Sequence, residues 1–514
     1  MLSLVGQVNQ VISVMLVPIS IGLVFSFCIE QFHSPRPQPV WRRSPADLLL
    51  HTGLWLVLFL IEFLQFCRPW LALCLTSTIF YVLVLINHAK YRSLREPFIY
   101  QDLEYFLDAL KHPRLYLPFF GFWKIALCLA AVGAALWVGV SVEAPLTETY
   151  PTEQVWISCI ALLLIAGALL LIGNLRKAEL SFKPAQDFYQ YGVFAMLWLY
   201  ARAERKAPPA ELAKYSTLTQ NNPPSDRSHL PDTIIVQSES FFDPRRVFSS
   251  IDPAVLTAFD QTCQDSIKFG TLIVPAWGAN TVRTEFEFLT GIDIANLGID
   301  QFNPYRRCMQ NGLPSIAQEF KKRGYRTICV HPYPASFYQR DTIFPLLGFD
   351  EFIDIKSFGD ATPSSGESPY ISDQVLTNKV LELLDQQIAQ PLFIFVITME
   401  NHGPLHLEAI SAAESGRWVN QPLPSVCKDL PVYLRHLANA DMMIDRLIKR
   451  FSSSSQRPAQ LLWYGDHVPV LSEVYNHLGL PNGQTDYFLW RSYDIRQVAP
   501  QPIHVYQLAV ELLH

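Results

Sequence analysis

The sequence predicts two units: an α-helical membrane domain with about five transmembrane helices, followed by an α/β domain with a mainly parallel sheet. Half of the 514 residues are hydrophobic and only 17% are charged, values between those of a soluble enzyme and a full membrane protein. Long apolar runs gather before residue 180, whereas short apolar runs alternate with helical patterns after residue 232. We therefore expect a transmembrane domain over 1–180, a surface helix and linker over 181–231, and the α/β domain over 232–514.

Five apolar runs have the length of a bilayer-spanning helix. They cover residues 11–28, 48–66, 70–86, 122–142 and 155–175. No Lys or Arg precedes the first run, so we expect a span there and not a cleaved signal peptide.

Two segments beside the apolar runs are candidates for contact with lipid. Residues 87–118 mix basic and aromatic side chains, and Lys90, Arg92 and Arg95 are candidate ligands for a lipid phosphate; a solvated loop is the alternative. Residues 182–206 predict one amphipathic helix at the membrane surface, with its aromatic residues at headgroup depth. The Pro-rich stretch 207–232 then reads as a linker.

Composition excludes some classes of function. The formal net charge of −6 argues against a nucleic-acid partner. The nine cysteines form no C-x-x-C pattern, so we do not expect a zinc site made of thiolates. A disulfide among the four cysteines of the second unit stays open; these are Cys263, Cys308, Cys329 and Cys427.

Alternating strands and helices predict the parallel sheet of the second unit. The expected strands are 233–237, 272–274, 327–330, 392–397 and 461–464. The clearest helical patterns between them cover 313–322, 372–387 and 435–451.

Polar side chains follow these strands at the points where the strands end. In chain order they are Glu239, the loop with Thr281, His331, His402, and Asp466 with His467. Ligands of an open parallel sheet bind beyond the carboxyl ends of its strands. One such residue alone is typical of a helix cap or of a hydrogen bond in the core. Polar residues after all five strands, at one edge of the sheet, predict a ligand-binding or catalytic site.

Residues 278–291 are central to this predicted site. They lead from an apolar run through a loop of small residues into a helical pattern, which places Thr281 at a helix N-terminus, where unpaired N–H groups favour an anion. A helix cap is the competing interpretation. Thr284 and Glu287 fit a capping box, which predicts a helix start near Thr284.

The chemistry of these residues suits phosphoryl transfer. Glu239, Asp466 and His467 offer hard oxygen and imidazole ligands for manganese, magnesium or zinc. Thr281 beside such a cation would have a lowered hydroxyl pKa and become a nucleophile.

Three further residues can hold the oxygens of a phosphodiester. They are His331, His402 and Arg340, and the planar fork of Arg340 matches such an anion best.

With these residues in place, the chain resembles a known family. The motifs that carry the resemblance are 237–240, 280–291, 348–350, 401–402 and 465–467. The second unit is similar to the sulfatase, or alkaline-phosphatase superfamily, domain. Nearly the whole chain resembles the branch of lipoteichoic acid synthases and membrane phosphoglycerol transferases.

The resemblance implies roles for the candidate residues. One divalent metal would be bound by Glu239, Thr281, Asp466 and His467, with Mn²⁺ expected and Mg²⁺ or Zn²⁺ as alternatives. Thr281 would be the nucleophile. The substrate would contact His331, Tyr338, Arg340 and His402.

The resemblance also implies the substrates and their place. The donor would be phosphatidylglycerol, and its glycerol phosphate would pass through a phosphothreonine-linked intermediate to an extracytoplasmic glycan or polymer. The protein would be a multi-pass component of a bacterial cytoplasmic membrane, with the α/β domain on the periplasmic or extracellular side. The charge rule conflicts with this topology, because the basic segment after the third span would normally be cytoplasmic. We follow the resemblance.

Alternatives from other classes remain. A phosphoethanolamine transferase has the same fold and a threonine nucleophile, and an inactive protein that only binds lipid or glycan is the alternative outside enzymes. A transporter fits poorly, because the polar candidate residues lie outside the spans. Sulfate-ester hydrolysis is disfavoured because the chain has no C-x-P-x-R motif.

Overall fold

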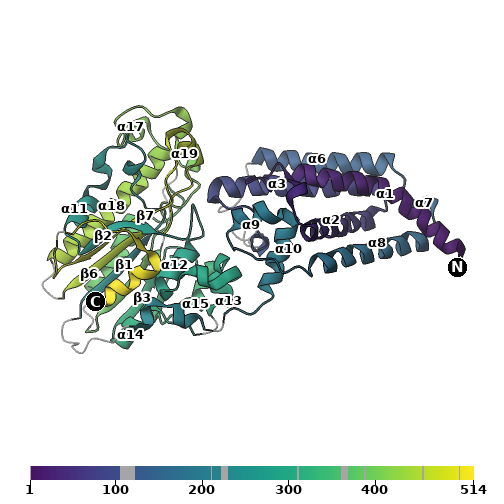
Figure 1. Cartoon of the computed structure of the whole chain (residues 1–514). Coiled ribbons are helices and arrows are strands. Elements are labelled where there is room, and N and C mark those ends of the chain that lie inside the picture. Colours follow the sequence, from purple (N-terminus) through teal and green to yellow (C-terminus); the bar gives the residue numbers. More distant parts are fainter. Residues whose placement is uncertain are drawn as a thin grey trace. The chain divides into compact units, whose positions relative to one another are not determined.

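The chain forms two compact units, Met1–Lys206 and Ala207–His514, which Figure 1 shows in a computed structural model. The structure describes residues 2–104, 122–209, 211–220, 230–309, 312–359, 368–386, 389–453, 457–496 and 498–514. The long apolar helices belong to the first unit and the sheet belongs to the second.

Five helices of the first unit are long and apolar enough to cross a membrane, which confirms the predicted helical membrane domain. Two of them begin at a proline in the first helical turn, where the missing N–H costs nothing. At the first of these starts, the Ser44 side chain also accepts a hydrogen bond from the Asp47 N–H. The five helices are α1 (Leu2–Glu30), α2 (Pro45–Phe66), α3 (Pro69–Leu94), α6 (Phe122–Val142) and α8 (Thr152–Gly173).

The segment 182–206 differs from the single surface helix expected there. It forms two helices, α9 (Pro184–Tyr191) and α10 (Val193–Glu204), separated by Gly192 in the left-handed region at φ 76°. A side chain at Gly192 would collide with the ion pair of Glu30 and Arg43.

Most of the aromatic residues of this segment pack inside the first unit. Phe188, Tyr191, Phe194 and Tyr200 are buried, and only Tyr189 among the five tyrosines and phenylalanines of α9 and α10 is half exposed. These four side chains therefore pack against neighbouring helices, and their depth in the membrane stays a prediction.

Part of the predicted linker is folded onto the second unit. Leu212 and Leu218 are buried in its core, and the Thr217 N–H donates to the Gly291 carbonyl at 2.9 Å. The prolines at 223 and 224 lie outside the described residues.

The second unit contains one eight-stranded sheet with the order β4-β3-β5-β1-β6-β7-β2-β8. Within the described residues only β7 pairs antiparallel with its neighbours, so the predicted mainly parallel sheet is confirmed. The strands are β1 (Asp232–Ser238), β2 (Lys268–Ile273), β3 (Arg326–Val330), β4 (Glu351–Ile353), β5 (Leu392–Ile397), β6 (Ala459–Gly465), β7 (Thr485–Arg491) and β8 (Ile503–His504). The sequence predicted five of them and missed β4, β7 and β8.

Helices cover both faces of this sheet because successive strand residues point to opposite sides. Ile234 and Val236 of β1 belong to one core, whereas Ile235 belongs to the other. The first core packs against α11 (Thr257–Gln264), α16 (Asp373–Asp385) and α18 (Asp429–Ser453). The second packs against α12 (Thr281–Thr290), α14 (Ile316–Lys322), α15 (Arg340–Leu346) and α20 (Val505–Leu508).

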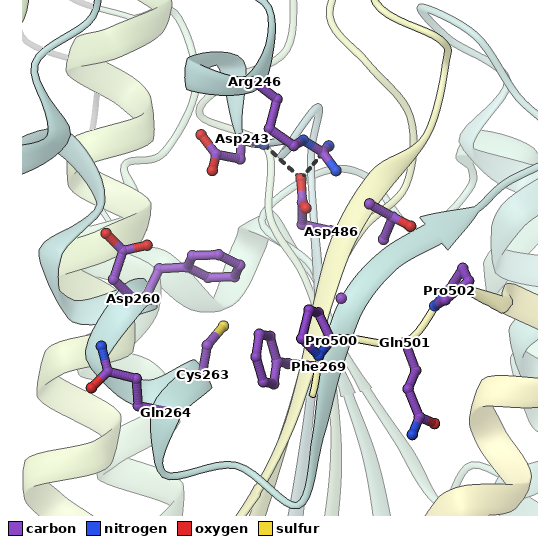
Figure 2. Close-up of a pocket in the computed structure, with 13 residues that line it drawn as sticks. Asp243, Arg246, Asp260, Cys263, Gln264, Phe269, Asp486, Pro500, Gln501 and Pro502 are labelled. Atoms are coloured by element: carbon purple, nitrogen blue, oxygen red, sulfur yellow. Dashed lines mark hydrogen bonds and ion pairs between the residues drawn. The ribbon is translucent and has the colours of Figure 1, made fainter. Parts of the chain in front are cut away.

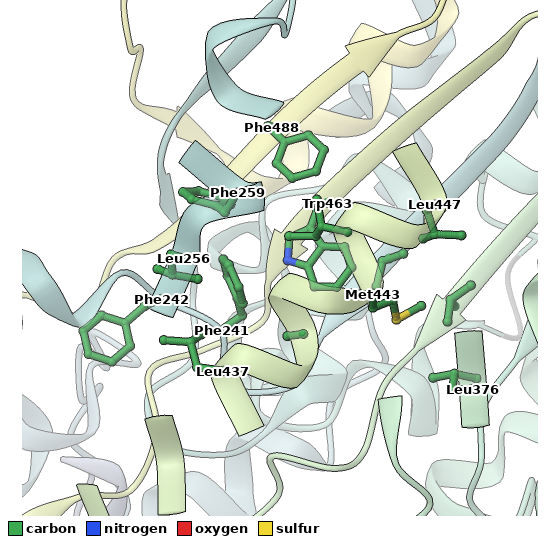
Figure 3. Packing of buried hydrophobic residues seen from close by; sticks show 14 of the residues in the cluster. Phe241, Phe242, Leu256, Phe259, Leu376, Leu437, Met443, Leu447, Trp463 and Phe488 are labelled. Atoms are coloured by element: carbon green, nitrogen blue, oxygen red, sulfur yellow. The ribbon is translucent and has the colours of Figure 1, made fainter. Parts of the chain in front are cut away.

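Aromatic residues fill the first core, as Figure 3 shows. The ring of Trp463 lies edge-on to Phe241 at 5.6 Å and stacks on Phe488 at 6.5 Å. Met443 and Leu447 of α18 close this layer from the helix side. All nine cysteines are free, so the disulfide that the sequence left open is absent.

Candidate active site

Neighbouring strands bring the predicted metal ligands together. Glu239 follows β1 and Asp466 follows β6, and the two strands pair in parallel up to Ser238 and Gly465. A side chain at Gly465 would collide with the backbone carbonyl of Phe241, so glycine is needed where the two chain segments approach. The acids therefore emerge side by side at the carboxyl edge of the sheet.

Hydrogen bonds fix the two carboxylates. Asp466 Oδ1 accepts from the N–H groups of Ser240 at 2.8 Å and His467 at 2.9 Å. The Ser240 hydroxyl donates to Glu239 Oε1 at 2.9 Å, and the Glu239 N–H donates to the Thr398 hydroxyl at 2.9 Å. The side chains are thus held in place within the protein itself.

Three ligand atoms and the Thr281 hydroxyl converge on one point. His467 Nδ1 lies 3.1 Å from the Val468 carbonyl, which can only accept, so Nδ1 carries the proton and Nε2 has a free lone pair. Nε2 lies 3.3 Å from Asp466 Oδ2, 3.5 Å from Glu239 Oε1 and 3.4 Å from Thr281 Oγ1.

Two features of this cluster fit a divalent cation. Asp466 Oδ2 is buried and has no hydrogen-bond partner in the described part of the chain, a costly arrangement for a carboxylate unless something binds it. Burial and the charge of Asp466 raise the pKa of Glu239 to about 8, which a bound cation would reverse. Glu239, Asp466 and His467 are all buried and close enough to share one ion.

Thr281 begins α12, in the place the sequence predicted. Asn280 precedes it in the left-handed conformation at φ 65°. The predicted capping box is wrong: the helix starts three residues before Thr284, whose hydroxyl donates to the Asp466 carbonyl at 2.8 Å. Glu287 instead accepts from the Ile294 N–H at 2.9 Å.

His331 and Arg340 also come together. His331 follows β3, and its Nε2 lies 3.2 Å from Arg340 Nη1. Burial and the neighbouring Arg340 charge lower the pKa of His331 well below its usual value. The guanidinium carbon of Arg340 lies 5.2 Å from the ring centre of Tyr338, a cation–π distance.

His402 follows β5, the strand that pairs with β1. Its Nδ1 lies 2.7 Å from the Gly403 carbonyl, which assigns the proton to Nδ1. The Tyr370 hydroxyl lies 3.3 Å from the same nitrogen. Burial lowers the pKa of His402, and the hydrogen bond with the Gly403 carbonyl opposes this in part.

Glu285 is a residue that the sequence reasoning missed. Its carboxylate is fully buried and forms an ion pair of 2.8 Å with Arg340. It lies four residues after Thr281, on the same face of α12, and that spacing was the signal that could have found it.

The basic residues proposed to bind a lipid headgroup lie in the first unit. Lys90 has partners within the first unit. Its ammonium contacts both carboxylate oxygens of Asp102, at 2.7 and 2.9 Å, and the Pro97 carbonyl at 3.1 Å. Lys90 thus already has an acidic partner, and its contact with a lipid headgroup stays a prediction. Arg92 and Arg95 stay predictions, and residues 105–118 of the same segment lie outside the described residues.

A cavity of about 570 Å³ lies elsewhere in the second unit, between α11 and the strands β2 and β7 (Figure 2). Asp486 at its wall accepts from the Asp243 N–H at 2.6 Å and from Arg246 at 2.9 Å. Burial raises the pKa of Asp486 to about 7. None of the predicted site residues lines this cavity.

Comparison with known proteins shows the family of the second unit. The sulfatase family model matches residues 231–514. The chain is 25% identical over 455 residues to the capsular polysaccharide biosynthesis protein RkpI of Rhizobium meliloti, covering 85% of this chain and 80% of that protein. It is 28% identical over 101 residues to lipoteichoic acid synthase 1 of Bacillus subtilis, covering 20% of this chain and 15% of that one.

A solved structure resembles both units together. The integral membrane lipooligosaccharide phosphoethanolamine transferase EptA of Neisseria meningitidis matches with a TM-score of 0.50 and 14% identity, over 87% of this chain and 88% of that one. At this identity the likeness shows the fold: apolar helices followed by an α/β domain.

Proposed function

This chain belongs to the sulfatase family, and from that premise we propose that it is a membrane phosphoglycerol transferase. It moves glycerol phosphate from phosphatidylglycerol to a glycan outside the cytoplasm. The sequence motifs around Thr281 and Asp466 support this branch of the family. The name of the relative RkpI, which covers most of the chain, supports a polysaccharide as acceptor.

One observation carries the proposal: the Thr281 hydroxyl lies 3.4 Å from the free nitrogen of His467, beside two buried carboxylates. Glu239, Asp466, His467 and Thr281 would hold one divalent cation, Mn²⁺ in this proposal. Such a cation would lower the pKa of the Thr281 hydroxyl and attract the negative charge that develops on a phosphate. Mg²⁺ and Zn²⁺ suit the same donor set of oxygen and imidazole.

The reaction proceeds by two displacements at phosphorus. Thr281 Oγ bonds to phosphorus, the bond from phosphorus to the diacylglycerol oxygen breaks, and that oxygen takes up a proton while the threonine hydroxyl loses one. A hydroxyl of the acceptor then attacks the same phosphorus and Thr281 leaves with a proton. The donor loses glycerol phosphate and the acceptor gains it, so the atoms balance.

The other site residues bind and orient the phosphodiester. Arg340 and His331 lie together at the end of β3, and Tyr338 stacks on the guanidinium. His402, with its proton on Nδ1, presents Nε2 from the end of β5. Fixed groups of this kind stabilise charge that develops on the phosphate oxygens.

The test is to incubate the full chain in detergent with Mn²⁺ and phosphatidylglycerol labelled in its headgroup. We expect release of diacylglycerol and label on the peptide that contains Thr281. Thr281→Ala should abolish both while the protein stays folded, because no hydroxyl remains to attack. Turnover near the wild-type rate in this variant would exclude Thr281 as the nucleophile.

The same assay separates the alternatives. Labelled phosphatidylethanolamine as the productive donor would assign a phosphoethanolamine transferase. A protein that binds the lipid but labels no residue and releases no diacylglycerol would be the inactive binding protein.

A further inference from the structure

The carboxylate of Glu285 has no role in the reaction as proposed, although it contacts a residue that the reaction uses. It accepts from Arg340 through both of its oxygens, Oε1 from Nε at 3.1 Å and Oε2 from Nη2 at 2.8 Å. Both side chains are buried. A two-pronged pair of this kind fixes the plane of the guanidinium as well as its distance.

The carboxylate is itself held from two other elements. The Tyr305 hydroxyl donates to Oε1 at 2.7 Å, and the Gln237 amide lies 3.4 Å from Oε2. Tyr464 donates to the carbonyl oxygen of the same Gln237 side chain at 2.7 Å. Gln237 stands two residues before Glu239 in the chain, so one network links the anchor of Arg340 to the strand that carries a proposed metal ligand.

Arg340 in turn fixes His331. His331 Nδ1 lies 3.1 Å from the Ile397 carbonyl, which can only accept, so Nδ1 carries the proton. Nε2 must therefore accept from Arg340 Nη1, at 3.2 Å. The guanidinium has five N–H groups, and these contacts use one each on Nε, Nη1 and Nη2. The second N–H of Nη1 and of Nη2 remains for a phosphate oxygen.

We propose that Glu285 is a positioning residue, which holds the Arg340 fork and, through it, the His331 ring in the orientation that receives the transferred phosphate. This inference rests on the proposed function, in which Arg340 contacts that phosphate. Glu285 also supplies the negative charge that a buried guanidinium requires. Phosphate affinity distinguishes this role from that of a merely structural ion pair, because a structural ion pair would affect stability and leave phosphate binding unchanged.

The experiment compares four variants of the full chain in detergent with Mn²⁺: Glu285→Gln, Arg340→Met, the double variant, and Glu287→Gln as the matched control. Glu287 is a second buried glutamate of α12, but it contacts the Ile294 backbone and no site residue. The readouts are Mn²⁺ binding, the affinity for inorganic phosphate by calorimetry, diacylglycerol release from phosphatidylglycerol, and the melting temperature.

We expect Glu285→Gln to lower kcat/KM by about 10- to 100-fold, the usual effect of losing a partner that orients a ligand. Its phosphate affinity should fall while its Mn²⁺ binding stays, and Glu287→Gln should keep the wild-type phosphate affinity, Mn²⁺ binding and turnover. In the double variant the loss of activity should not exceed that of Arg340→Met alone, because Glu285 acts through Arg340. The double variant should also melt above Glu285→Gln, because it buries no unpaired charge.

Two results would overturn the inference: wild-type turnover and phosphate affinity in Glu285→Gln, or losses that multiply in the double variant. Failure of the proposed function looks different. A wild-type chain that releases no diacylglycerol would contradict the donor, while phosphate affinity in Glu285→Gln would still decide the role of Glu285. Unchanged phosphate affinity in Arg340→Met would remove Arg340 from the substrate site altogether.

Discussion

At the scale of single residues, Asp466 shows how one side chain is divided between structure and chemistry. Oδ1 accepts two backbone N–H groups, which orient the carboxylate, whereas Oδ2 is buried beside His467 Nε2 without a hydrogen bond in the described part of the protein. An orphaned buried oxygen destabilises a folded protein unless a ligand compensates it. Metal binding and stability should therefore be coupled at this residue.

Asp466→Asn tests that coupling. We expect added Mn²⁺ to raise the melting temperature of the wild-type protein, because an ion that binds only the folded state stabilises it. The variant should lose this response and bind Mn²⁺ at least about 10-fold more weakly, since even an outer partner of a metal ligand contributes that much. Calorimetry and thermal melts with and without a chelator measure both effects.

Asp486→Asn is the control, because Asp486 is also buried, but its carboxylate pairs with Arg246 and is not one of the proposed metal ligands. It should keep the full response to Mn²⁺. An unchanged response in Asp466→Asn would refute the metal assignment.

Glu287 gives a second prediction, on the dependence of stability on pH. Burial raises the pKa of Glu287 to about 8 from an ordinary value of 4.5. The folded state thus holds a proton that the unfolded state releases, so this residue lowers stability as pH rises from about 4.5 to 8, by on the order of 5 kcal/mol in total. Glu287→Gln should therefore gain stability over the wild type as pH rises from 5 to 9. Thermal melts across this range measure the difference, and two parallel curves would contradict it.

At the scale of elements, the end of β6 decides whether the site can form. Asp466 reaches Glu239 only because Gly465 lets the end of β6 approach the Phe241 carbonyl. Parallel pairing of β1 with β6 sets the direction of both chains, and the glycine sets their distance.

Gly465→Ala should therefore impair stability and activity together. Forcing a methyl group into a packed position costs about 1–3 kcal/mol, and here the obstacle is backbone, which cannot rotate away. Thermal melts and diacylglycerol release measure the two losses. Gly167→Ala in α8 is the control, because an added methyl meets nothing there. A Gly465→Ala protein with wild-type Mn²⁺ affinity and turnover would show that the approach of the two strands is not needed.

At the scale of the whole molecule, two indicators of topology conflict. The charge rule would place the basic segments, and with them the α/β domain, in the cytoplasm. In the segment after the third span, the basic residue Lys90 is paired in the folded protein, with Asp102 at 2.7 Å. A positive charge with a structural partner is a weaker indicator of side, and we keep the domain outside the cytoplasm in our proposal.

A reporter fused after Leu230 tests this topology. Alkaline phosphatase, which is active only outside the cytoplasm, should be active in the fusion, and a fluorescent protein that matures only in the cytoplasm should stay dark. The reverse pattern would overturn the topology, and an extracytoplasmic glycan could then not be the acceptor.

The sequence by itself predicted the five apolar helices, five of the eight strands described here and most of the candidate site residues that the structure brings together. Apolar runs of bilayer length and short buried runs are local signals, and the residues directly after parallel strands must meet at one edge. Thr281, Asp466 and His467 could be placed together for this reason, without any distance between them.

Only the tertiary structure decided which partner each side chain takes. The sequence predicted a capping box of Thr284 and Glu287. In the structure, Thr284 donates to the Asp466 carbonyl and Glu287 accepts from the Ile294 N–H. The sequence also named Lys90 as a candidate ligand for a lipid phosphate, and it did not foresee the ion pair of Lys90 with Asp102. The spacing of four residues from Thr281 could have placed Glu285 on the same helix face, but the ion pair of Glu285 with a residue 55 positions away leaves no local pattern. Periodicity reports which face of an element is buried, whereas the choice of polar partner depends on long-range packing that brings distant segments into contact.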